Sequence, residues 1–156
     1  MELAREFELV TCFQDGLNYL LTQEELEQTF YSVFNRLVDQ GLFIFDLSLE
    51  EKFSELDIGK TNFIDKEDYS LVYQTDYLSE KAIWVIKITG FVKEDQKYIK
   101  FQESHQKKYH GLGSVKRSLE LVGFKVLDVF EAFSLEMPHN GSNRVFIIAQ
   151  KNEGRE

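Results

Sequence analysis

At 156 residues the chain is long enough for one domain with its own hydrophobic core. Apolar residues make up 43% and charged residues 29%, as in ordinary soluble globular proteins. Lys and Arg number 18 against 27 Asp and Glu, giving a formal net charge of −9. This balance argues against nucleic acid or an anionic membrane surface as the partner and leaves neutral or cationic small molecules open.

The start of the chain and its single cysteine bear on location. The first residues, MELAREFELV, have neither the basic region nor the long apolar stretch of a signal peptide. No apolar run reaches the roughly 20 residues of a membrane span. Cys12 is the only cysteine, which excludes an intrachain disulfide, and its place in an apolar run favours packing over a reactive thiol. We expect a soluble, cytoplasmic protein.

The first elements form a strand–helix–strand pattern. Phe7–Phe13 is a short apolar run typical of a buried strand. Thr22 followed by Glu25 is a capping box that starts a helix, and Gly41 suits the position that ends one. The apolar face of this helix is predicted to comprise Leu26, Phe30, Val33, Phe34 and Leu37. Leu42–Leu47 is a second strand, so the segment predicts a βαβ unit with parallel strands and a right-handed crossover.

The middle of the chain changes character. In the mixed, charged segment Leu49–Asp68 we expect a short helix around Glu50 to Leu56 and a loop around Gly59. Three strands are then predicted, at Ser70–Tyr77, Ala82–Val92 and Tyr98–Lys108. The charged turn KEDQK joins the last two as an antiparallel hairpin.

Strand alternation predicts which side chains of this hairpin share a face. Trp84, Ile86 and Ile88 share one face of the first strand. In the second strand one face is formed by Ile99, Phe101, Glu103, His105 and Lys107.

The last third returns to the earlier pattern, which we expect to be parallel. A helix is predicted from the spacing of Leu112, Val115, Leu119 and Val122, and it closes at Gly123. Phe124–Phe133 and Arg144–Lys151 are the last two strands. The pattern predicts a single α/β domain over residues 1–156 with a β-rich insertion at 69–109.

Four stretches in this order carry a family resemblance: FELVTCFQDGLNYLLTQEEL, LVDQGLFIFDLS, QESHQKKY, and LELVGFKVLDVFEAF followed by RVFIIAQK. They resemble the C-terminal half of class I S-adenosylmethionine (SAM)-dependent methyltransferases of the small-molecule N/O type. Members often read D-x-x-N-Y-L after the fourth strand and L-x-P-G-G before the fifth, where Asp39 and Gln40 depart from the pattern. The resemblance implies the last four strands of a Rossmann-like sheet with an inserted antiparallel sheet.

The resemblance also makes an absence informative. The family binds SAM through a glycine-rich turn after its first strand, and Gly111-x-Gly113 follows no suitable strand and reads as a loop. SAM is thus the implied cofactor, with its main binding motif and the first three βα units missing. We expect this chain alone to bind SAM weakly or not at all. The unpaired edge at Phe7–Phe13 implies a homodimer or completion by another chain.

Asp15, Asn18 and Tyr19 follow the first strand, at the edge where open α/β sheets place ligands. Asx side chains also stabilise turns, and Tyr19 can be simple packing. Under the resemblance these residues form a wall near the methyl-transfer position. Asp15 then orients or deprotonates an amine or hydroxyl, while Asn18 and Tyr19 line the substrate pocket.

Other candidates lie further along. Asp46 ends the second predicted strand and either faces the cleft or caps the next turn. Glu103, His105 and Tyr109 form either a solvated face or a substrate wall with His105 as proton carrier. No third ligand has convincing spacing for a metal at Glu103 and His105.

The remaining assignments complete the predicted site. Under the resemblance Phe13 and Gln14 are cofactor-binding, and Arg144 is structural. Trp84 is the core of the insertion or a subunit contact. The leading function is methyl transfer to N or O of a small molecule, and the alternative is a non-catalytic dimerisation or regulatory module or a truncated methyltransferase-like protein.

Overall fold

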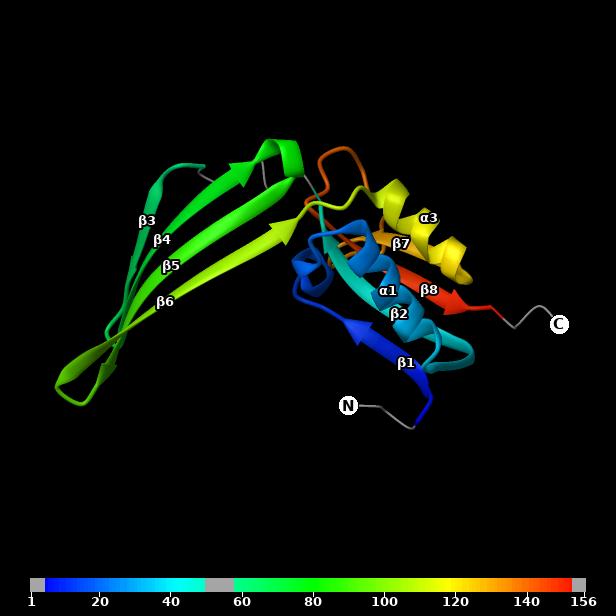
Figure 1. Cartoon of the computed structure of the whole chain (residues 1–156), viewed down its shortest axis with the longest axis horizontal. Helices are drawn as coiled ribbons and strands as arrows, with labels where there is room; N and C mark the ends of the chain where they lie inside the picture. Colours follow the sequence, from blue (N-terminus) through cyan, green and yellow to red (C-terminus); the bar gives the residue numbers. More distant parts are fainter. Residues whose placement is uncertain (1–4, 50–57, 153–156) are drawn as a thin grey trace.

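The computed structural model describes residues 5–49 and 58–152, which form two four-stranded sheets. Figure 1 shows one sheet packed with two helices and the other extending away from it. The helix expected around Glu50 to Leu56 lies outside the described residues. None of the helices in residues 5–49 and 58–152 is long and apolar enough to cross a membrane.

The first sheet has the order β1-β2-β8-β7. Its strands are β1 (Phe7–Cys12), β2 (Leu37–Ser48), β7 (Phe124–Glu131) and β8 (Arg144–Lys151). As predicted, β1 and β2 are parallel. The expected parallel run is wrong for β8, which is antiparallel to both β2 and β7. Residues 132–143, between β7 and β8, contain no helix to carry the chain back over the sheet, so the chain simply reverses.

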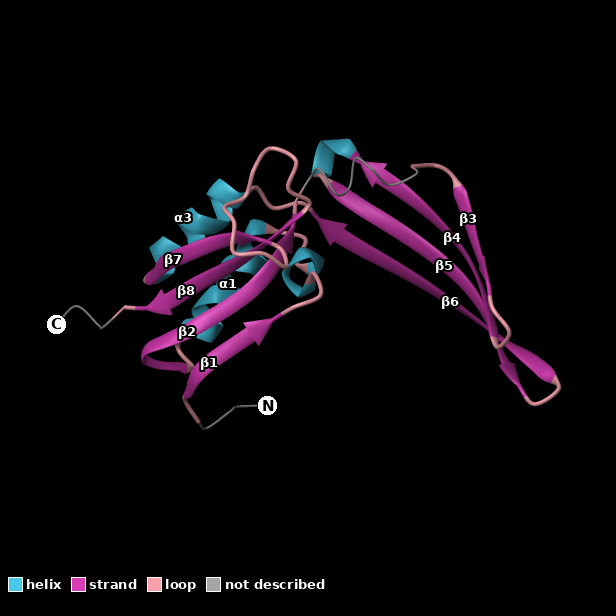
Figure 2. Ribbon diagram, turned by 180° about the vertical axis from the view of Figure 1, so that it is seen from behind, coloured by secondary structure: helices cyan, strands magenta, loops and turns pink. Residues whose placement is uncertain are grey.

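Two helices cover one face of this sheet. They are α1 (Gln23–Phe34) and α3 (Leu112–Val122), and in Figure 2 both lie behind the strands. The predicted capping box at Thr22 and Glu25 is confirmed, and Gly123 closes α3 with a φ of 116° that favours glycine. Fully buried side chains between helices and sheet include Leu26, Phe30, Phe43, Phe45, Leu119, Val145 and Ile147.

The predicted end of the first helix is wrong. α1 stops at Phe34 with Asn35 as its C-cap, and Leu37 and Gly41 belong to β2. Gly41 is needed for close packing instead of capping, because a Cβ there would lie 2.8 Å from the Val38 carbonyl oxygen. The register between β1 and β2 shifts over this stretch, which is typical of a β-bulge.

The predicted burial of the first strand is also wrong. Phe7 is 37% and Leu9 50% exposed, because β1 is the outermost strand of its sheet. An apolar run by itself cannot distinguish an interior strand from an edge strand.

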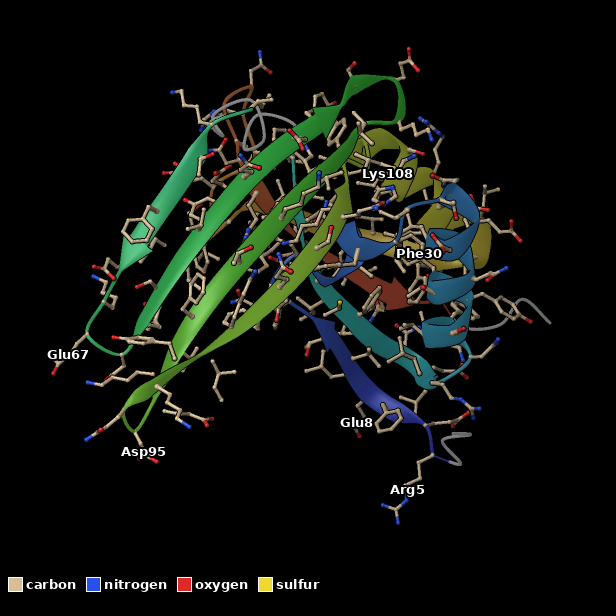
Figure 3. The ribbon with its side chains drawn as sticks, turned by 60° about the vertical axis from the view of Figure 1, so that its left-hand side comes forward. Arg5, Glu8, Phe30, Glu67, Asp95 and Lys108 are labelled. Atoms are coloured by element: carbon tan, nitrogen blue, oxygen red, sulfur yellow. The ribbon has the colours of Figure 1, made fainter. Side chains whose placement is uncertain are left out.

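The second sheet, here called the arm sheet, is antiparallel in the order β3-β4-β5-β6. Its strands are β3 (Thr61–Asp65), β4 (Tyr69–Leu78), β5 (Ile83–Glu94) and β6 (Lys97–Lys108). The last three were predicted, as was the β5–β6 hairpin, whereas β3 was not. Figure 3 shows Lys108 beside the helices and Asp95 at the far end of the arm sheet.

The register of the hairpin places both predicted groups of side chains on one face. Trp84 pairs with Lys107, Ile86 with His105, and Ile88 with Glu103. Directly opposed residues lie on the same side of an antiparallel pair. Glu103, His105 and Lys107 therefore share a face of the arm sheet with Trp84, Ile86 and Ile88.

The short connections are η1 (Gly16–Tyr19), a 3₁₀ turn after β1, and η2 (Ser79–Lys81), which links β4 to β5. η1 is the element that contacts both β2 and β6. It therefore joins the two sheets.

Candidate active site

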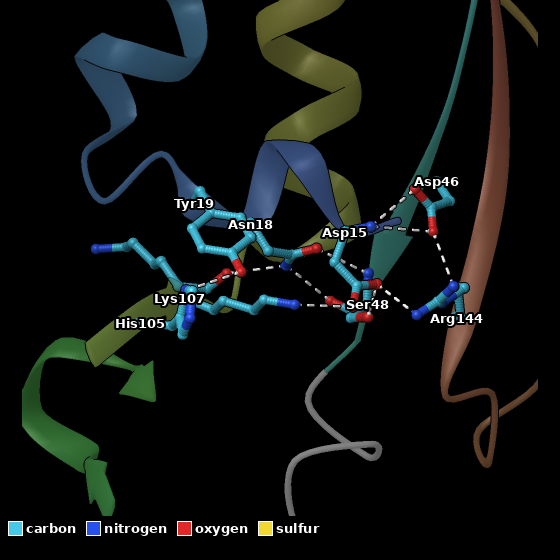
Figure 4. Close-up of polar contacts among 9 residues, drawn as sticks. Asp15, Asn18, Tyr19, Asp46, Ser48, His105, Lys107 and Arg144 are labelled. Atoms are coloured by element: carbon cyan, nitrogen blue, oxygen red, sulfur yellow. Dashed lines mark hydrogen bonds and ion pairs between the residues drawn. The ribbon is translucent and has the colours of Figure 1, made fainter. Parts of the chain in front are cut away.

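The chain turns sharply as it leaves β1. Gln14 and Asp15 have φ values of 65° and 60°, in the left-handed region that residues other than glycine seldom adopt. This turn leads into η1 and directs the Asp15 side chain toward the ends of β2 and β8 (Figure 4). Strained backbone of this kind persists where surrounding contacts hold it, and such contacts surround Asp15.

Both carboxylate oxygens of Asp15 are engaged. Oδ1 accepts from the Ser48 hydroxyl and from Arg144 Nη2 at 2.7 Å. Oδ2 accepts from Lys107 Nζ at 3.1 Å. The side chain is only 9% exposed, so the carboxylate lies between two cations and a hydroxyl. This geometry favours a positioning role for Asp15 over the proton abstraction considered from the sequence.

Asp46 shares Arg144 with Asp15. Arg144 Nη1 lies 3.1 Å from Asp46 Oδ2, and the Asp15 backbone N–H donates to the Asp46 carboxylate at 3.1 and 3.3 Å. Burial raises the pKa of Asp46, assisted by the neighbouring Asp15 charge and opposed by the backbone N–H and Arg144. These contacts hold the turn after β1, a role that was not predicted from the sequence, and the two predicted roles of Asp46 stay predictions.

Stability should depend on pH through Asp46. Its folded-state pKa is raised, so the folded protein binds this proton more tightly than the unfolded chain does. The stabilisation is therefore present at low pH and lost as pH rises past the ordinary Asp value toward the raised one. We expect the free energy of unfolding of the parent, minus that of Asp46→Asn, to fall as the pH rises above about 4, the ordinary pKa of an Asp carboxyl. Urea denaturation across this range measures it.

The matched control is Asp128→Asn, since Asp128 is exposed on β7. Its difference from the parent measures the effect of removing an exposed carboxylate over the same range. A flat difference for Asp46→Asn would contradict the assigned burial effect.

Asn18 connects the two sheets. Its side-chain amide donates to the Lys108 carbonyl at 2.9 Å and the Ser48 carbonyl at 3.2 Å, and its oxygen accepts from the Ser48 N–H at 3.0 Å. The residue is fully buried. Asn18 thus fixes the end of β6 against the end of β2, and its amide is occupied by backbone instead of facing a substrate.

Tyr19, His105 and Glu103 form the accessible polar group of the site. The Tyr19 hydroxyl lies 3.4 Å from His105 Nδ1, and His105 Nε2 lies 2.9 Å from Glu103 Oε2. Lys107 Nζ lies 4.9 Å from the centre of the Tyr19 ring, and Tyr19 is 45% exposed. A carboxylate, an imidazole and a phenol in sequence can accept a proton at one end and stabilise the resulting imidazolium at the other. We refer to these three residues as the proton relay.

The other predicted residues divide between this site and the core. Phe13 is 47% exposed and packs edge-on against Phe146 at 5.7 Å, with the exposed Gln14 beside it. Tyr109 is partly buried and packs against the core of the first sheet, and its place on a substrate wall stays a prediction. Trp84 is buried and stacks on Tyr77 at 4.7 Å, as expected for the core of the insertion.

Two functional neighbours were missed from the sequence. Ser48 was not singled out, although it lies two residues after Asp46 and so on the same face of β2. Lys107 was placed on the correct strand face, but its ion pair with Asp15 was not foreseen. In the described part of the chain, no three His, Cys, Asp or Glu side chains gather in a way that would hold a metal ion.

Comparison with known proteins reveals two curated relatives. The chain is 32% identical over 146 residues to "Putative methyltransferase" of Geobacillus sp. (strain WCH70), covering 93% of this chain and 59% of the relative. It is 29% identical over 148 residues to "Putative methyltransferase YqeM" of Bacillus subtilis (strain 168), covering 95% and 60%. The chain therefore spans about three-fifths of the length of the relatives it matches. No protein-family profile matches it.

Solved structures share the fold. An S-adenosylmethionine-dependent methyltransferase from Clostridium acetobutylicum superposes with a TM-score of 0.89 at 22% identity, covering 98% of this chain and 61% of that one. The sugar N-methyltransferase KedS8 from Streptoalloteichus gives 0.74 at 13% identity, covering 98% and 59%. The predicted fold class, part of a Rossmann-like methyltransferase sheet with an inserted antiparallel sheet, is confirmed.

Proposed function

We propose that this chain supplies the acceptor side of a SAM-dependent methyltransferase that transfers a methyl group to a nitrogen or oxygen of a small molecule. The observation that carries the proposal is the exposed proton relay formed by η1 and β6, in a fold shared with SAM-dependent methyltransferases. Both curated relatives bear methyltransferase names, which supports the same class of reaction.

SAM, when bound, supplies an electrophilic methyl group, so the protein must align the acceptor and remove its proton. The relay is suited to this: His105 accepts the acceptor's proton directly or through Tyr19, and Glu103 stabilises the imidazolium. Asp15 and Arg144 hold the turn from which Tyr19 projects.

The described residues fit only part of SAM. The exposed Phe13 ring and Gln14, at the carboxyl end of β1, provide an apolar and a polar group where open α/β sheets bind ligands. No described residue forms a glycine-rich turn after a parallel strand. We therefore assign Phe13 and Gln14 to one side of the cofactor site only.

An amine is the preferred acceptor. Glu103 places an exposed carboxylate next to the relay, and the chain has a net charge of −9, which favours a cationic substrate over an anionic one. The sugar N-methyltransferase named among the structural neighbours acts on the same kind of group.

The cofactor assignment predicts weak but localised SAM binding. On titration of the ¹⁵N-labelled chain with SAM, we expect amide shifts concentrated at Phe13, Gln14 and Asp15, with dissociation constants in the millimolar range. Isothermal titration should show no micromolar affinity, because only one side of the site is present. Micromolar binding would contradict the assignment of half a site, and unperturbed amides at Phe13–Asp15 would contradict its location.

A further inference from the structure

We propose that the β1 edge of the first sheet and the apolar surfaces beside it bind a polypeptide of alternating strands and helices. This partner corresponds to the two-fifths of the curated relatives' length that the chain does not match. The proposal concerns an interaction surface and does not depend on methyl transfer. Three features of the described residues converge on it.

The first feature is the strand edge itself. Within the described residues β1 pairs only with β2, and Figure 3 shows β1, with Glu8, at the border of the sheet. Phe7 and Leu9 are 37% and 50% exposed along it. Parallel strands normally lie in the interior of a sheet. Because β1 is apolar and pairs in parallel with β2 along one edge, its other edge favours pairing with an additional strand.

The second feature is the sheet face opposite the helices, which we call the free face. Strand alternation and pairing place on it Leu9, Leu42, Ile44, Phe130, Phe146 and Ile148. Neither α1 nor α3 lies over this face, as Figure 2 shows from its side. Parallel α/β sheets carry helices on both faces, so the free face calls for an added helix.

The third feature is a groove of about 750 Å³ on the helix side, between β1 and α1. Apolar side chains in its lining include Phe7, Val10, Leu20, Tyr31 and Val33. A strand added beside β1 in parallel must be joined to the sheet by a crossover, usually a helix, and this groove is where a helix neighbouring α1 would lie.

A second copy of this chain suits the surface less well. α1 bears Glu24, Glu25 and Glu27 and no basic residue, and the whole chain has a net charge of −9, so like charges would meet. A two-fold axis would also pair β1 with β1 antiparallel and leave the free face without a helix. The relatives, by contrast, contain an unmatched portion of about 40% of their length, enough for several strands and helices.

The test is co-expression of the full chain with the unmatched portion of the Bacillus subtilis relative as a separate polypeptide. We expect a 1:1 complex by size-exclusion chromatography with light scattering. Leu9→Glu on the free face and Tyr31→Glu in the groove, respectively 50% and 61% exposed, should each weaken it by at least about tenfold. Leu121→Glu, at an 83% exposed position on α3, is the matched control and should leave binding unchanged.

The other outcomes overturn the proposal. A homodimer that excludes the second polypeptide would assign the surface to a second copy. If the chain stays monomeric and does not bind the second polypeptide, the surface needs no partner. A complex weakened equally by all three variants would show that binding does not depend on this surface. Circular dichroism of each variant confirms that the fold is retained. SAM titration of the chain alone tests the proposed function separately, so each idea can fail without the other.

Discussion

Arg144→Met is expected to lower the free energy of unfolding by about 3–5 kcal/mol, the usual cost of breaking a buried ion pair by removing one partner. Arg144 contacts Asp15 at 2.7 Å and Asp46 at 3.1 Å, and the two carboxylate side chains are 9% and 1% exposed. Without the guanidinium, Asp46 loses its ion pair with Arg144, while Asp15 loses one cation and retains Lys107. Methionine replaces the aliphatic stem, so the loss reports on charge and hydrogen bonding more than on packing. Urea denaturation at neutral pH measures it.

Arg117→Met serves as the control, since Arg117 is exposed on α3 and its loss should change stability by less than about 0.5 kcal/mol. The destabilisation by Arg144→Met should shrink in acid, where carboxylates take up protons and need no cation. A loss below about 1 kcal/mol, or one independent of pH, would show that the two carboxylates do not depend on Arg144.

Local patterns predicted most of the elements. The capping box at Thr22 and Glu25 and the glycine at Gly123 are short-range signals, and both mark real helix ends. Gly41 was wrongly predicted to end the first helix. Glycine is needed there because the backbone passes close to the Val38 carbonyl oxygen, and glycine is also the residue that commonly ends helices. β3 was missed because polar and apolar residues are mixed on both of its faces, as Asn62, Phe63 and Ile64 show, so the sequence has no apolar strand face. Its hydrogen-bonded pairing with β4 makes it a strand.

The sequence grouped Asp15, Asn18 and Tyr19 at one place, but it did not predict most of the side chains and backbone groups that they contact. Position at the carboxyl end of a parallel strand, together with the family resemblance, selected Asp15, Asn18 and Tyr19. Their partners come from elsewhere: Lys107 is 92 residues from Asp15 along the chain, and the Lys108 carbonyl is 90 from Asn18. Those contacts depend on how the arm sheet meets the first sheet, which no periodicity encodes. A candidate base could therefore not be distinguished from a paired structural carboxylate.

The second large effect concerns the proton relay and is measured in the proposed complex of this chain with the unmatched portion of the Bacillus subtilis relative. With an amine acceptor and tritiated SAM, we expect His105→Gln to lower kcat by roughly 10²-fold or more, as for loss of a general base. The acid limb of the pH–rate profile, which an imidazole base produces, should disappear with it. Glu103→Gln should cost less, because it leaves the imidazole in place and removes only its charge partner.

His139→Gln is the matched control, since His139 lies in the exposed loop between β7 and β8, where its Nδ1 accepts from the Gly141 backbone N–H and its own backbone N–H donates to the Ser142 hydroxyl. It should leave kcat, KM and the pH profile unchanged. The separate effects of His105→Gln on kcat and KM distinguish two roles for His105. A raised KM at constant kcat would mean that the imidazole lines the pocket and carries no proton. A fall in kcat with the acid limb kept would instead place the base elsewhere. Only the loss of both assigns the proton to His105, and Tyr19→Phe then shows whether the phenol at 3.4 Å passes it on.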